Sequence, residues 1–194
     1  MRRFRVALCF ILVMALIACS SDKENSESMN ANKSGDEVEV TFPAILFQNQ
    51  NIDIVIDNAK SKGVKEVIKN EDGSLTYKMT KSVYNELFNE IETTITKMVD
   101  EGKKKLQSVK DITHNKTLSE FTFVVDRKSY ENSMDGLVIY TLGVVALNYQ
   151  IFKEKDSSDD KVSISLKDEK TGDVFSVFEF PDVLEGFYQE KNKK

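Results

Sequence analysis

The sequence predicts an α+β fold in which a mostly antiparallel sheet of about seven strands carries helices on one face. Apolar residues alternate with polar ones in several short segments, as in half-buried strands, and recur at helical spacing in the segments between them. Only Pro43 and Pro181 occur, and no linker rich in proline or glycine interrupts residues 37–190. We interpret this stretch as a single α+β domain.

The first half of this domain is predicted to form a strand, a helix, a hairpin and a second helix. Val38–Phe42 alternates as a strand does, and Ile52–Ala59 follows at helical spacing. Polar turn residues divide Val64–Met79 into the two arms of a hairpin. A clear apolar stripe over Tyr84–Met98 predicts the second helix, with Thr80 or the nearby Ser82 as its N-cap.

The second half is predicted to contain two more hairpins and two more helices. Val109–Val125 is predicted to form a hairpin, a third helix runs from about Lys128 to Phe152, and Val162–Phe180 forms the last hairpin. A short helix begins after Pro181. The domain is therefore expected to be one strand followed by three helix–hairpin units.

Two of these units are similar in sequence. Val64–Val67 matches Val109–Ile112, and Asn70 matches Asn115. A duplicated helix–hairpin unit would explain the match, and so would the selection of similar residues by similar elements. Both explanations stay open at this point.

The segment Asp135–Phe152 is the most apolar one outside the N-terminus. Its uninterrupted apolar part, Leu137–Leu147, is about half as long as a membrane span. The hairpins before and after it are also expected in one sheet, which a membrane crossing would prevent. A helix that is apolar nearly all round is buried, so we expect the central helix of the core here.

Residues 1–18 have the pattern of a secretory signal peptide. Three arginines precede Val6–Ile17, an apolar run shorter than the roughly 20 residues of a membrane-spanning helix. The end of the run, Leu16–Cys19, resembles a bacterial lipobox, whose cysteine is acylated after cleavage. Each buried CH₂ contributes about 0.8 kcal/mol, so two or three acyl chains on Cys19 would anchor the protein stably.

Residues 19–36 comprise the lipidated Cys19 and a flexible polar tether. Ser20–Asp36 has almost no apolar residues and no periodicity, so it cannot form a packed core. The whole chain has 27 basic and 32 acidic residues, and cleavage after residue 18 would remove three arginines and leave a formal charge of −8. No basic cluster is interleaved with aromatic residues, which argues against nucleic acid as a partner.

Several segments together resemble a known group of proteins. They are the lipobox Leu16–Cys19, "VTFPAILF" at Val40–Phe47, "GVKEVIKNEDGSLTYKMTKS" at Gly63–Ser82 and "DEKTGDVFSVFEFPD" at Asp168–Asp182. They are similar to uncharacterised small lipoproteins of low-GC Gram-positive bacteria. The resemblance covers nearly the whole chain and implies the lipid anchor and the fold, but it supplies no catalytic residue.

No pattern in the sequence predicts a catalytic, cofactor or metal site. His114 is the only histidine and falls in a predicted hairpin turn, where it is expected to be solvated surface. Asp156–Asp160 lacks the glycine and distal glutamate of a calcium loop. Cys9 would leave with the signal peptide and Cys19 would be acylated, so the mature chain would have no free thiol.

One surface is a candidate for binding. On the last predicted strand, Phe175 and Val177 fall on the face opposite to Phe178 and Phe180, and Val124 similarly interrupts the polar face of its own strand. We expect an apolar patch of Phe175, Val177 and Val124 that either binds a partner or is covered by the C-terminal helix.

These observations predict a membrane-anchored lipoprotein on the extracytoplasmic face of the cell membrane. Its domain is expected to be a non-catalytic binding or interaction module for an unidentified protein or small ligand. The alternative is a cell-envelope enzyme that uses a pair of carboxylates. A third hypothesis gives the signal fragment "LVMALIA" a role of its own as a peptide pheromone.

Overall fold

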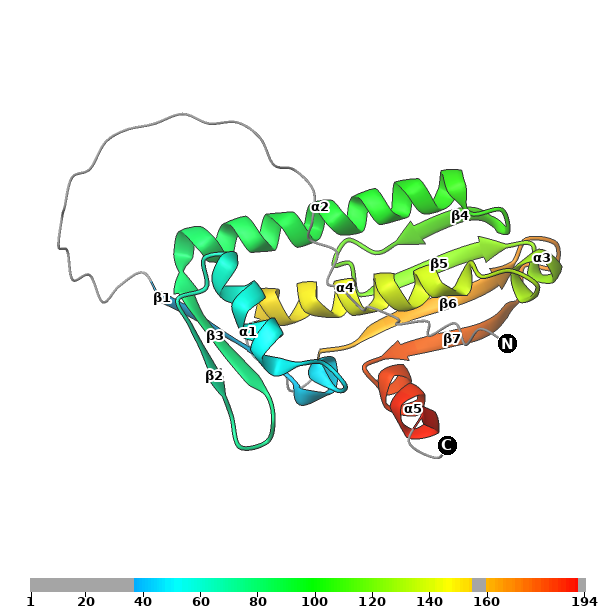
Figure 1. Cartoon of the computed structure of the whole chain (residues 1–194). Helices are drawn as coiled ribbons and strands as arrows, with labels where there is room; N and C mark the ends of the chain where they lie inside the picture. The colour runs from blue at the N-terminus through cyan, green and yellow to red at the C-terminus, as the bar shows by residue number, and fades with distance from the viewer. Residues whose placement is uncertain (1–36, 155–159, 192–194) are drawn as a thin grey trace, which may run out of the picture. The chain divides into compact units, whose positions relative to one another are not determined.

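The computed structural model describes residues 37–154 and 160–191. The predicted signal peptide (1–18), with Cys9, and the predicted tether (19–36), with Cys19, lie outside the described residues. The described part contains seven strands in two sheets and five α-helices (Figure 1). The α+β class predicted from the sequence is confirmed.

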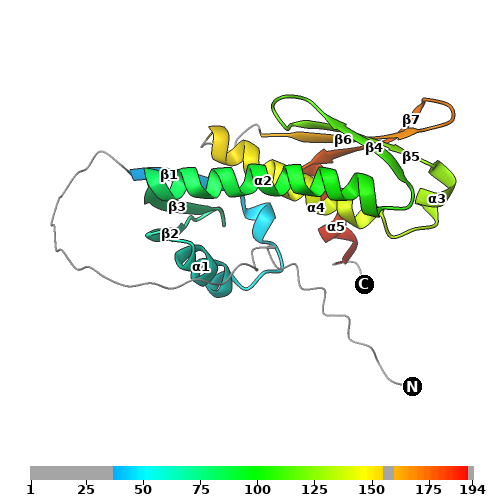
Figure 2. The ribbon, with the colours of Figure 1, turned by 90° about the horizontal axis from the view of Figure 1, so that it is seen from above.

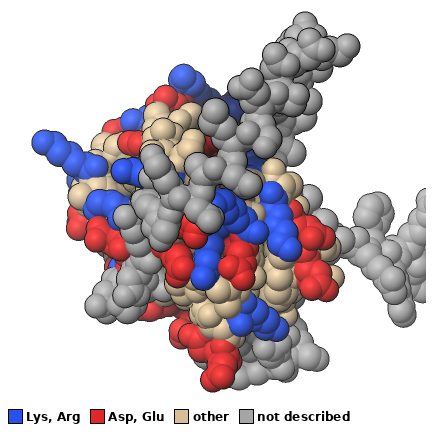
Figure 3. Space-filling model, turned by 90° about the vertical axis from the view of Figure 1, so that its left-hand side faces the viewer, with Lys and Arg blue, Asp and Glu red and all other residues tan. Residues whose placement is uncertain are grey.

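The three-stranded sheet comprises the first three strands of the domain. They are β1 (Glu37–Phe42), β2 (Glu66–Lys69) and β3 (Leu75–Thr80), antiparallel in the order β1-β3-β2. On its outer face Lys78 lies opposite both Glu39 and Glu66, and its Nζ is 3.1 and 3.9 Å from their carboxylate oxygens. Figure 3 views this side of the molecule and shows basic and acidic side chains interspersed.

The four-stranded sheet contains the remaining strands. They are β4 (Val109–His114), β5 (Glu120–Val125), β6 (Val162–Asp168) and β7 (Val174–Phe180), in the order β4-β5-β6-β7. The prediction of a single sheet of about seven strands was wrong, because the described strands form two sheets. The prediction of mostly antiparallel pairing is confirmed, since four of the five described strand pairs are antiparallel and β5 pairs parallel to β6. A parallel pair needs a crossover connection, which a helix between the two strands supplies.

The described part of the chain has one 3₁₀ helix and five α-helices. They are the 3₁₀ helix η1 (Ala44–Phe47) and the α-helices α1 (Ile52–Ser61), α2 (Lys81–Lys105), α3 (Arg127–Glu131), α4 (Gly136–Glu154) and α5 (Asp182–Lys191). Thr80 is the N-cap of α2, since its side chain accepts a hydrogen bond from the Val83 backbone N–H. The apolar stripe of α2 is buried, and Leu87, Ile91 and Ile95 lie on it.

The predicted third helix is broken into α3 and α4. The Asp126 side chain caps α3, and Asn132 to Asp135 form the corner between the two helices. The Oδ2 atom of Asp135 accepts hydrogen bonds from the backbone N–H and the hydroxyl of Ser108. Asp135 is therefore held to the segment before β4, and a continuous helix through Asn132–Asp135 would lose this attachment.

Helix α4 is the central helix of the core, as predicted. By length and composition it would suit a membrane span, but half of its apolar stretch is buried within the protein. It contacts α2, β1, β6 and β7, and it lies with α2 on one face of the four-stranded sheet (Figure 2). Helix α2 joins the two sheets along the chain, and α4 packs against strands of both.

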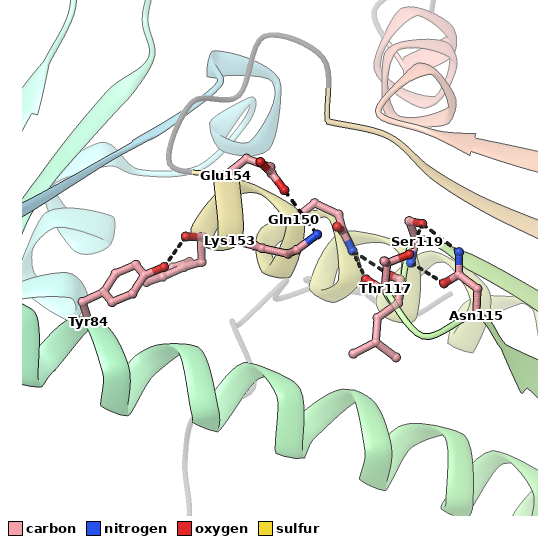
Figure 4. A network of polar contacts seen from close by, with 9 residues as sticks. Tyr84, Asn115, Thr117, Ser119, Gln150, Lys153 and Glu154 are labelled. Atoms are coloured by element: carbon pink, nitrogen blue, oxygen red, sulfur yellow. Dashed lines mark hydrogen bonds and ion pairs between the residues drawn. The ribbon is translucent and has the colours of Figure 1, made fainter.

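Two polar contacts fix α4 at its C-terminal half (Figure 4). The amide nitrogen of Gln150 donates to the carbonyl oxygens of Thr117 and Leu118, at 2.8 and 3.0 Å, and so holds the β4–β5 turn. The Tyr84 hydroxyl of α2 donates to the Phe152 carbonyl oxygen at 2.6 Å. These bonds fix the position of α4 relative to α2 and the four-stranded sheet.

Candidate functional site

The outer face of the four-stranded sheet is the first candidate surface. The cross-strand neighbours on this face include two rows that carry valines, one of Asp111, Val124, Lys167 and Val174, and the other of Thr113, Thr122, Ser165 and Val177. Helices α2 and α4 cover the opposite face, and among the described elements Figure 2 shows none over this one. We call these two rows the open face.

The open face carries apolar side chains that water reaches. Val174 is 53% exposed and Val177 is 49% exposed, while Val124 is partly buried between its neighbours. Helix α5 contacts β7 but leaves both β7 valines about half exposed. The structure therefore places Val124 and Val177 together on one uncovered face, and partner binding by them stays a prediction.

Phe175 does not share this face, contrary to the prediction. A bulge in β7 lets Lys167 pair with Val174 and Leu166 pair with Ser176, so Phe175 is an extra residue. Its ring packs edge-on against Tyr130 of α3, with the centroids 6.4 Å apart, and the Arg127 guanidinium lies 4.6 Å from the ring centroid. Because Phe175 packs against α3, it is not part of the open face.

The second candidate surface is the corner between α3 and α4, which sequence reasoning missed. Met134 is 74% exposed and Leu137 is 54% exposed. They border a shallow groove of about 220 Å³. The groove is lined by Tyr130, Ser133, Met134, Gly136, Leu137 and Tyr140. The sequence carries a signal for this corner, since Asn132, Ser133 and Asp135 are residues that favour helix ends and turns.

Asp126, at the start of α3, links this helix to the four-stranded sheet. Asp126 caps α3 by accepting from the Ser129 backbone N–H at 2.8 Å, and it also accepts from Lys170 Nζ at 2.8 Å. The hydrogen bond from Lys170, together with those from Ser129, holds the pKa of Asp126 well below its usual range. Burial raises the pKa of the Tyr130 hydroxyl above its ordinary value. The start of α3 is thus tied to the β6–β7 turn.

The residues considered for chemistry are not brought together. His114 is the last residue of β4, is exposed, and its Nδ1 lies 2.8 Å from the Asn115 carbonyl oxygen. Within residues 37–154 and 160–191, no three His, Cys, Asp or Glu side chains are grouped to hold a metal ion. Of the acidic loop Asp156–Asp160, all but Asp160 lies outside the described residues.

Comparisons of the chain with protein-family models, with curated proteins and with solved structures find no significant match.

Proposed function

We propose that this chain is a membrane-anchored extracytoplasmic lipoprotein whose domain is a non-catalytic binding module. The N-terminal pattern supports the anchor: a basic start, a short apolar run and the lipobox ending in Cys19. Residues 20–36 would then tether the domain close to the outer face of the cell membrane.

The observation that carries the binding role is the open face. The half-exposed Val174 and Val177 lie on the edge strand β7, on a sheet surface that no described helix covers. Val124 lies on the inner strand β5, and the hydroxyl side chains of Thr122 and Ser165 lie between Val124 and Val177. Val and Thr side chains have few rotamers to lose when a partner orders them. Apolar groups on an uncovered sheet face are therefore well suited to contact another protein.

The size of the open face sets the kind of complex to expect. Four strands about 4.8 Å apart and six or seven residues long present about 400 Å². Stable complexes bury about 800 Å² on each partner. We therefore expect a transient complex with an envelope protein, formed at low affinity and favoured by confinement of both partners to the membrane.

The alternative, an enzyme with two convergent carboxylates, gains no support from the described part of the chain. Several carboxylates there meet basic side chains at the surface instead. Examples are Glu37 with Lys65 at 2.8 Å and Asp111 with Lys103 at 3.0 Å.

Replacement of the predicted acylation site tests the anchor. Cells that express the wild-type chain or Cys19→Ser are fed an alkyne-tagged fatty acid and then fractionated. We expect the wild-type protein to carry the tag and to sediment with membranes, and Cys19→Ser to carry none. A tagged Cys19→Ser protein, or an untagged wild-type protein, would contradict the anchor.

Charge placed on the open face tests the binding role. Cells with Val177→Lys, or with the control Ile54→Lys, are treated with a reversible crosslinker, and captured proteins are compared. Ile54 is 58% exposed and lies on α1, so the control adds the same charge at an equally exposed apolar site. We expect only Val177→Lys to lose the captured partner, at an unchanged Tm. Equal capture by both variants would contradict the proposal.

A further inference from the structure

The α3–α4 corner presents two apolar side chains to water at one place. Five large apolar residues of the described chain are exposed. Val174 and Val177 lie on the open face, Ile54 lies on α1, and Met134 and Leu137 border one groove at the corner. Met134 is 74% exposed, the largest exposed fraction among these residues. The corner therefore presents the apolar side chains of Met134 and Leu137 where they are accessible to an apolar phase.

The residues around these tips suit the boundary of a bilayer. Tyr130 and Tyr140 line the groove, and tyrosine is enriched at membrane interfaces because its ring is apolar and its hydroxyl is polar. The acidic side chains close by in sequence are engaged: Glu131 pairs with Arg127 at 2.8 Å, and Asp135 accepts from Ser108.

The length of chain before β1 allows the corner to reach the membrane. Glu37 pairs with Thr80 at the N-terminal end of α2, while Ser108, just beyond its C-terminal end, bonds the corner through Asp135. The 25 residues of α2 span about 37 Å. Eighteen residues lead from Cys19 to Glu37. Such a segment can extend to about 60 Å, so an anchored Cys19 and a membrane-bound corner are compatible.

We propose that the α3–α4 corner docks on the lipid surface, with Met134 and Leu137 inserted at the boundary between headgroups and acyl chains. This proposal rests on the proposed anchoring through Cys19. The contact is hydrophobic rather than electrostatic, since the chain without residues 1–18 carries a formal charge of −8. It leaves the open face free for a partner, because α4 lies on the opposite face of the four-stranded sheet.

A fluorescent probe on the corner tests the proposal in the full chain. Met134→Cys and the control Ile54→Cys are expressed with the native N-terminus, purified with acylated Cys19 and reconstituted in vesicles of phosphatidylcholine and phosphatidylglycerol. After cleavage of the signal peptide and acylation of Cys19, the introduced cysteine is the sole free thiol for an environment-sensitive dye. Vesicles with brominated acyl chains then quench any dye that enters the bilayer.

We expect a blue shift and loss of emission for the dye at position 134, and neither at position 54, at low and at high salt. A dye at 134 that stays unquenched while the protein floats with the vesicles would overturn the corner contact. A blue shift without quenching would overturn it in favour of a protein contact, such as a second copy of the chain. A protein that does not float would instead overturn the anchoring on which the proposal rests.

Discussion

The ring of Phe180, the last residue of β7, lies directly against Gly143 in the middle of α4. A Cβ atom at position 143 would overlap three carbon atoms of this ring. Phe180 is fully buried, so the ring has little room to move. The absence of a side chain at Gly143 is what allows α4 to pack closely on β7.

Substitution of Gly143 by alanine is expected to destabilise the fold, although alanine favours helices. Overpacking against Phe180 should lower the free energy of unfolding by about 1–3 kcal/mol, and Gly143→Leu should lower it further. The control is Gly186→Ala in α5, where an added Cβ meets nothing within 4 Å. That change should be neutral or stabilise by up to about 1 kcal/mol. Urea unfolding measures both, and a Gly143→Ala variant as stable as Gly186→Ala would contradict the packing.

The amide of Gln150 is expected to be important for the β4–β5 turn. Gln150→Met keeps the volume of the side chain but leaves the Thr117 and Leu118 carbonyl oxygens without this donor. The loss should be about 1–3 kcal/mol in the free energy of unfolding. Thr141→Val on the same helix removes only a bond to the Leu137 carbonyl oxygen of its own helix and serves as the control. Equal stability of the two variants would show that Gln150 does not hold the turn.

Tyr77 is expected to titrate late at alkaline pH. Burial raises its pKa to about 12, from an ordinary value of 10.0. Because the folded pKa is the higher one, this contribution to stability is complete below about pH 10 and is lost as the pH rises toward about 12. Ultraviolet titration of the wild type should show a tyrosine that ionises near pH 12 and is missing in Tyr77→Phe. Ionisation of Tyr77 near pH 10 would show that the ring is accessible.

Asp126 is expected to stabilise the corner most at neutral pH. Its pKa is depressed in the folded protein, so its contribution is present above the ordinary carboxyl range and is lost as the pH falls below that range. Asp126→Ala should therefore lower the Tm at pH 7 and have less effect near pH 3. Asp126→Asn retains the helix cap but loses the charge paired with Lys170. Its Tm at pH 7 should therefore lie between those of the wild type and Asp126→Ala. A Tm difference that does not depend on pH would contradict this role.

The order of the elements could be predicted from the sequence because it depends on local patterns. The alternation of Val38–Phe42, the stripe of α2 and its Thr80 cap involve residues close in the chain, and each appears in the structure as expected. The agreement breaks at the α3–α4 corner. There the contact that matters, between Asp135 and Ser108, joins residues 27 positions apart.

The sheet pairing could not be predicted in the same way. Alternation states which side of a strand is buried, but it does not state which strand lies beside it. No local sequence pattern therefore predicts that β3 and β4 belong to different sheets, or that β5 pairs parallel to β6. A common origin of the helix–hairpin units stays a prediction.

The candidate surface was predictable only in part. Alternation placed Val124 and Val177 on the outer face, where the structure also has them. It misplaced Phe175, because the extra residue of a bulge shifts the alternation by one position. A substitution of Phe175 by lysine would therefore disrupt the ring contact with Tyr130 and would not test binding at the open face.

Site-specific photo-crosslinking at the open face tests the central claim most directly. A photoreactive phenylalanine analogue is placed at Val177, or at Ile54 as the control, in cells that express the acylated chain. We predict a discrete crosslinked product from position 177 that is lost when Val124→Lys is added, and none from position 54. The absence of a product at 177, or the same product from both positions, would contradict a binding module that acts through the open face.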